Sequence, residues 1–137
     1  MSSLLDLNAL DISKNLIENI QPLNSLAAAL QVLNAPSNQI ENIQPLSSLV
    51  NLKILDVSSN RIENIQPLTS LTTLLLLDAS SNQIENIQPV SSLVALQTLR
   101  LSNNQITNTE PLIPLVRLNP MKGNLNASLD HGNTTLN

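Results

Sequence analysis

The chain has 137 residues, the size of a single domain, and its net charge is −4 at pH 7. It contains no Phe, Trp, Tyr or Cys, and its one histidine, His131, lies in a polar stretch near the C-terminus. This composition excludes disulfides and thiolate metal sites, and it disfavours both acid–base catalysis and nucleic-acid partners. We therefore expect a protein that is not an enzyme and that needs no cofactor and no metal.

One phrase recurs along the chain and sets its organisation. Ile-Glu-Asn-Ile-Gln-Pro begins at Ile17, Ile40, Ile62 and Ile84, and an altered fifth copy begins at Ile106. A fixed period of this kind is typical of solenoid proteins, in which each copy packs against its neighbours.

Each copy is predicted to open with a short strand. In Leu55-Asp56-Val57, apolar residues alternate with a polar one, which is the period of a half-buried strand. Strands of successive copies are expected to stack in parallel, about 4.8 Å apart. The strands would then form one continuous parallel sheet.

An asparagine follows each predicted strand. A sharp turn at this point leaves backbone donors and acceptors to be satisfied, and an asparagine amide can donate and accept at once. We interpret these residues as a structural asparagine ladder rather than a metal or sugar site. The ladder consists of Asn15, Asn38, Asn60, Asn82 and Asn104.

The remainder of each copy favours a short helix. Gln-Pro ends the turn, because the residue before proline is extended and proline suits the first position of a helix. Leu46, Leu49 and Leu52 then follow at a spacing of three, which fits one or two turns of 3₁₀ or α-helix. The predicted unit is strand, asparagine turn, proline and short helix.

The full pattern, seen in Leu52, Leu55, Val57, Asn60 and Ile62, resembles the leucine-rich repeat family. The resemblance implies an α/β solenoid, a right-handed superhelix with its parallel sheet on the concave face and short 3₁₀ or α turns on the convex face. It implies about five repeats and a degenerate sixth. The sequence of the repeats is similar to the bacterial internalin type and to the eukaryotic phosphatase-regulatory type, and both types remain possible. Members of both groups are binding proteins.

The repeats divide the chain unequally. We assign residues 1–118 to the repeat array and 119–137 to a degenerate terminal repeat with a polar tail. Met121 falls on the register of Leu99, although Gly123 weakens that last strand. Neither end carries an obvious polar cap, so self-association through the ends is one expectation.

Period two places a candidate partner-binding surface on the concave sheet. An apolar row would lie beside an acidic row, which suits a partner with basic and aliphatic groups. In the alternative interpretation the apolar row only supports neighbouring strands. Asp56 beside Asp78 should be destabilising, and Lys53 or Arg100 could offset it. The predicted partner-binding residues are Val32, Ile54, Asp56, Leu76, Asp78, Thr98 and Arg100.

The glutamates form a second acidic row, with one carboxylate in each repeat, at Glu18, Glu41, Glu63 and Glu85. Calcium takes several carboxylate oxygens, so this row is too dilute for a calcium site and is interpreted as a solvated edge.

The leading function is a protein-interaction module that uses the concave sheet. The alternatives are an internalin-like surface-recognition or adhesin fragment, and a structural array, natural or consensus-like, that self-associates through its ends. No signal peptide is recognised at Met1, which predicts a cytoplasmic location, or a secreted or surface location if the leader is missing. The longest apolar run, Leu74 to Leu77, is too short for membrane insertion.

Overall fold

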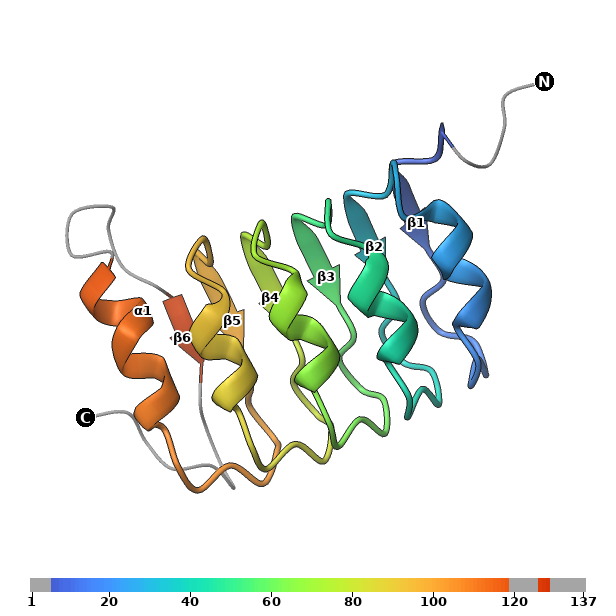
Figure 1. The fold of residues 1–137 in the computed structure, drawn as a ribbon. Coiled ribbons are helices and arrows are strands. Elements are labelled where there is room, and N and C mark those ends of the chain that lie inside the picture. The colour runs from blue at the N-terminus through green and yellow to red at the C-terminus, as the bar shows by residue number, and fades with distance from the viewer. Residues whose placement is uncertain (1–5, 119–125, 129–137) are drawn as a thin grey trace.

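The computed structural model describes residues 6–118 and 126–128, which form a single curved stack of repeats (Figure 1). Its strands are β1 (Ala9–Asp11), β2 (Val32–Asn34), β3 (Ile54–Asp56), β4 (Leu76–Asp78), β5 (Thr98–Arg100) and β6 (Asn126–Ser128). Its 3₁₀-helices are η2 (Gln21–Leu26), η3 (Gln44–Ser48), η4 (Gln66–Ser70), η5 (Gln88–Ser92) and η6 (Glu110–Leu112), and α1 (Ile113–Leu118) follows η6 directly.

The strands form one parallel sheet in chain order, from β1 to β6. Each strand pairs with the next in the register that the repeat predicts, so that Leu33 lies beside Leu55 and Leu55 beside Leu77. The short helices cover the other face of the sheet (Figure 1). The predicted leucine-rich repeat solenoid, with a parallel sheet and 3₁₀ turns, is confirmed.

The apolar positions of the repeat fill the space between sheet and helices. The middle residues of β2, β3 and β4, which are Leu33, Leu55 and Leu77, are fully buried, while their neighbours on each strand are half-buried. Leu46 and Leu68 from the helices meet them from the convex side and are also fully buried. Leucine and isoleucine in every repeat therefore build one continuous core.

A second asparagine column, which is not part of the predicted ladder, lies just before each 3₁₀-helix. The side-chain Oδ1 of Asn42 accepts a hydrogen bond at 2.9 Å from the backbone N–H of Gln44, two residues later. Asn64 makes the same bond to Gln66 at 2.8 Å. This local bond orients the chain at the glutamine that begins each 3₁₀-helix, and proline follows as the second helical residue.

The fifth repeat, which opens with β5, is longer than the 22-residue register implies. Leu99 pairs with Ala127 and not with Met121, because η6 continues into α1 and adds helical residues on the convex side. The prediction for the register of Met121 is therefore wrong. The polar tail after Ser128 lies outside the described residues.

Candidate functional site

The sheet register brings the predicted concave rows together. Ile54 lies beside Val32 on one side and Leu76 on the other, and Thr98 continues this row. All four of these side chains are half-buried. The row is therefore continuous across four strands and remains partly accessible on the face of the sheet.

The polar row runs along the ends of the same strands. Asp56 pairs with Asp78, and Asp78 pairs with Arg100. Each aspartate is fixed by the serine two residues later. Asp56 Oδ1 accepts bonds from the Ser58 hydroxyl at 2.7 Å and the Ser58 backbone N–H at 3.0 Å. Asp78 Oδ1 accepts the equivalent bonds from Ser80 at 2.6 and 3.1 Å. Both carboxylates are thus held in place before any partner binds.

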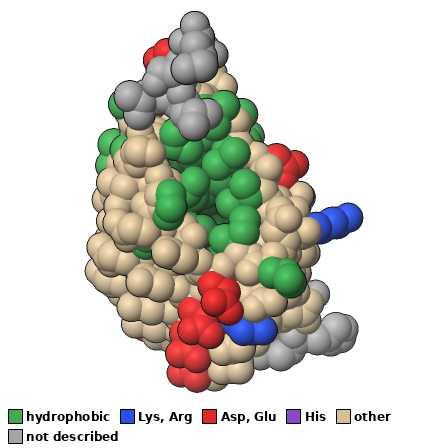
Figure 2. Space-filling view, turned by 90° about the vertical axis from the view of Figure 1, so that its right-hand side faces the viewer, with side chains coloured by type: hydrophobic (Ala, Val, Ile, Leu, Met, Phe, Trp, Pro, Cys, Tyr) green, Lys and Arg blue, Asp and Glu red, His purple; other side chains and the backbone are tan. Residues whose placement is uncertain are grey.

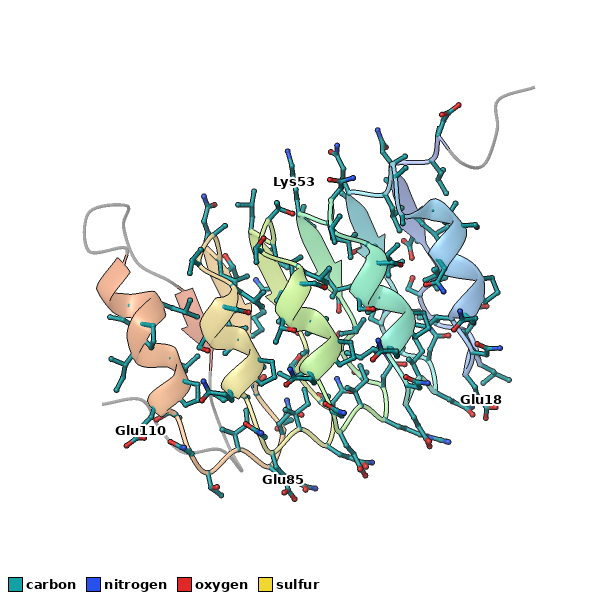
Figure 3. All side chains as sticks on the ribbon, viewed as in Figure 1. Glu18, Lys53, Glu85 and Glu110 are labelled. Carbon is teal, nitrogen blue, oxygen red and sulfur yellow. The ribbon has the colours of Figure 1, made fainter. Side chains whose placement is uncertain are left out.

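Arg100 lies close enough to Asp78 to offset part of the repulsion between the aspartates. Its Nη1 is 3.8 Å from Asp78 Oδ2, and its side chain is 52% exposed. A pair of this exposure contributes about 1 kcal/mol at most. Lys53 lies where the strands begin, at the opposite end of the strands from the acidic row (Figure 3). No ion pair joins it to another described residue. Of the two candidates, only Arg100 contacts the acidic row.

The same aspartate–serine arrangement occurs at the first strand. The Ser13 hydroxyl and backbone N–H donate to Asp11 and lower the pKa of this carboxyl below its ordinary value. The N–H bond measures 2.9 Å. Hydrogen bonds to the ionised form stabilise it, so Asp11 carries its negative charge at neutral pH.

The asparagines of the interior turns are buried and fully engaged. Asn60 Nδ2 donates to the carbonyls of Val57 and Ser58 in its own turn and of Ala35 in the preceding repeat, at 3.0 to 3.1 Å. Its Oδ1 accepts from the Ile40 N–H at 3.0 Å. Equivalent bonds are made by Asn38, Asn82 and Asn104. With their donors and acceptors engaged in backbone bonds, these side chains act within the scaffold.

Asn15 differs from the other members of the predicted ladder. Its side chain is exposed and donates only within its own turn, to the carbonyls of Ile12 and Ser13 at 3.0 Å. The described residues place no earlier turn beside it, and both of its bonds stay within its own repeat.

The glutamate row lies along the side of the stack where the turns lead from the strands to the 3₁₀-helices, which we call the turn edge. The labelled Glu18 and Glu85 point away from the body there (Figure 3). Two polar grooves of about 390 and 380 Å³ lie between neighbouring repeats on this edge, and Glu63 lines both of them. Arg61 also lines the larger groove. Residues 6–118 contain no group of three His, Asp or Glu side chains placed to hold a metal ion. None of the helices described is long and apolar enough to cross a membrane.

The solved structures similar to this chain include three internalins of Listeria monocytogenes. Internalin C2 is 36% identical with a TM-score of 0.84 over 93% of this chain, and internalin F is 34% identical with a TM-score of 0.82 over 96%. The chain spans 53% of the internalin C2 structure and 36% of the internalin F structure.

A third internalin is similar to this chain over nearly its whole length. The functional domain of InlJ, which is 26% identical with a TM-score of 0.80, is described as including a cysteine ladder. It matches 97% of this chain, and the chain spans 27% of it. Here there is no cysteine, and asparagine stands in the buried turns.

No curated protein matches the chain significantly. A family model does: Leucine Rich repeats (2 copies) matches residues 28–70 and 69–114, more than half of the sequence. Together with the parallel sheet, the 3₁₀ convex helices and the internalin structures, this match shows that the chain belongs to the leucine-rich repeat family.

Proposed function

We propose that this protein is a non-enzymatic interaction module whose concave sheet binds a protein with basic and aliphatic groups. The observation that carries the proposal is the apolar row beside two preorganised carboxylates, Asp56 and Asp78. Leucine-rich repeat solenoids use such concave surfaces for extended contacts.

The chemistry of the two rows defines the expected partner. Ile54 and Leu76 are only half-buried, so a partner's aliphatic side chains can cover their remaining surface. The aspartates already accept hydrogen bonds from Ser58 and Ser80, and ordering them costs little when a Lys or Arg approaches. Thr98 and Arg100 would lie at the margin of the contact.

Two alternatives remain from the sequence. An internalin-like surface-recognition or adhesin role is supported by the 36% identity to internalin C2, of which this chain spans about half. A cytoplasmic location stays a prediction, and a surface location goes with this alternative. Self-association through the ends is supported by apolar side chains at the N-terminal end of the stack that are only half-buried, such as Leu7, Leu10 and Ile17.

Neutralising the two aspartates tests the proposed face. Asp56→Asn with Asp78→Asn keeps an acceptor oxygen for each serine and removes both charges. Glu41→Gln with Glu63→Gln makes the same change in net charge on the turn edge and is the matched control. We expect a captured partner to bind the aspartate variant about tenfold more weakly, mostly through slower association at low salt.

Surface plasmon resonance measures the affinity and the association rate of the partner for the parent and for both variants. Equal affinity of the aspartate variant and the parent, with loss in the glutamate variant, would move the binding site to the turn edge and contradict the proposal.

A further inference from the structure

The N-terminal end of the stack presents apolar side chains that interior repeats bury. Leu7, Leu10 and Ile17 are only half-buried, whereas the equivalent Leu30 and Leu33 of the next repeat are fully buried. Figure 2 shows this end with hydrophobic side chains gathered at its centre. We call this area the N-terminal end surface, made of Leu7, Leu10, Ile12 and Ile17.

Strand β1 also has a free edge on this surface. Towards β2 it uses the Asn8 carbonyl, which accepts from the Val32 N–H at 2.9 Å, and the Ile12 N–H, which donates to the Asn34 carbonyl at 2.8 Å. Val32 and Asn34 thus point their backbone groups back towards the preceding strand. Their counterparts in β1 are Ala9 and Asp11, so the N–H and C=O groups of these two point outward. In the described sheet, no strand precedes β1.

Opposite charges lie the same number of residues before and after Leu10. Asp6 lies four residues before Leu10 and Lys14 four residues after it, and both side chains are exposed. A two-fold axis through Leu10 would bring the Asp6 end of one copy beside the Lys14 end of another.

From these features we infer that the N-terminal end surface binds a second copy of this chain through an antiparallel, two-fold pairing of β1 centred on Leu10. Ala9 of each copy then exchanges two backbone hydrogen bonds with the partner's Asp11. The leucines face each other as a non-hydrogen-bonded pair, the geometry in which side chains approach most closely. The two sheets join into one.

The neighbouring registers are worse. A pairing centred on Asp11 would put two carboxylates directly beside each other, which is destabilising. A pairing centred on Ala9 would place Leu10 beside the partner's Asn8, which loses the apolar contact. Only the register centred on Leu10 joins leucine to leucine and sets Asp6 near the partner's Lys14.

A head-to-tail contact with the other end of the stack fits less well. Strand β6 has the sequence Asn-Ala-Ser, so the in-register residue for Leu10 would be an alanine. Such a contact would also leave one free edge and continue as an open filament, whereas the two-fold pairing closes.

A single introduced cysteine tests the register, because the chain has none of its own. In the proposed pair, the two copies of Leu10→Cys have Cα atoms about 4.5 Å apart, within the range that a disulfide spans. In the matched control, Asn8→Cys, the two Cα atoms are roughly 13 Å apart, since four residues separate them along the strand.

We expect Leu10→Cys to form a disulfide-linked dimer under mild oxidation and Asn8→Cys to remain unlinked, as read on a non-reducing gel. Equal cross-linking of both variants, or none in either, would overturn the proposed pairing.

A charge exchange keeps the proposal testable if the cysteine variant folds poorly. Asp6→Lys and Lys14→Asp alone should each raise the dimer dissociation constant about three- to tenfold, because each places like charges together at two symmetric positions. The double variant should restore the parent value. Asp tolerates the left-handed backbone of position 14.

Sedimentation equilibrium over a range of concentrations measures the dimer dissociation constants of the parent, the two single variants and the double variant. A parent that stays monomeric throughout, or a double variant as weak as the single ones, would overturn the inference. The Asp56→Asn, Asp78→Asn protein should dimerise like the parent, since its substitutions lie on the concave face. Failure of the concave-face proposal and failure of the dimer are therefore separate results.

Discussion

The interior and N-terminal repeats carry nearly the same sequence in different surroundings. Leu55 has a strand on each side and is fully buried, whereas its counterpart Leu10 has a strand on one side and is half-buried. Asn60 reaches back to the preceding repeat, whereas Asn15 bonds only within its own turn. Residue type is the same at both of these positions, leucine in the strand and asparagine in the turn, so the differences in burial and bonding reflect the neighbouring repeat.

The largest expected difference comes from the core leucines. Leu55→Ala should lower the free energy of unfolding by about 2–5 kcal/mol, because it removes packed atoms and leaves a cavity closed on both sides. Leu10→Ala should cost under about 1.5 kcal/mol in the monomer, since that side chain is already partly in water. Urea denaturation at a concentration too low for dimers compares them. Equal losses would mean that stacking does not set the stability of these repeats.

The asparagine turns should give the next largest difference. Asn60→Leu strands the Ile40 N–H and several carbonyls and should cost about 1–3 kcal/mol. Asn15→Leu should cost much less, because the carbonyls that Asn15 serves can reach water. The midpoints of thermal unfolding measure both. If Asn60→Leu had the same thermal midpoint as the parent, the asparagine ladder would not contribute to the stability of the protein.

The smallest effect concerns a strained residue in each turn. Ser59 has a φ of 55° and Lys14 has a φ of 57°, in the left-handed region that asparagine tolerates better. Asn103 occupies the same position in the fifth turn with a φ of 56°. In the monomer, Ser59→Asn and Lys14→Asn should each raise the free energy of unfolding by up to about 1 kcal/mol, and equally, because this strain is local. Urea denaturation at a concentration too low for dimers measures both. A clear difference between them would show that neighbours also shape the turn.

Most of the fold was predictable because the same apolar spacing recurs in every repeat. Alternation around Leu55 identified the strand, and the spacing of Leu46 and Leu49 identified the convex helix. The register of Met121 was wrong because the helical extension at α1 departs from the repeat, and periodicity cannot measure a segment that does not repeat.

The candidate site was harder to predict than the fold. The concave rows follow from period two, but the serine bonds that fix Asp56 and Asp78 depend on turn geometry. Arg100 and Lys53 could be separated only in three dimensions, since both are close to the acidic row in sequence. The asparagine of Asn42-Ile43-Gln44-Pro45 was visible as a repeated motif, and its spacing before Gln-Pro was a usable signal for the helix start.

The buried asparagines give the array a direction. Each one bonds its own turn and the turn before it, so the backbone of a repeat depends on the asparagine of the repeat that follows. Removing the first repeat would cost Asn38 one acceptor, the Ile12 carbonyl, and one donor, the Ile17 N–H, and would leave every later turn intact. Removing a later repeat would strip the turn in front of it of its partner, as Ile62 would lose Asn82. We therefore expect that deleting repeats from the N-terminus destabilises the array less than deleting them from the C-terminus. After a C-terminal deletion, amide hydrogen exchange should become faster first in the last remaining repeat and then in the repeats before it.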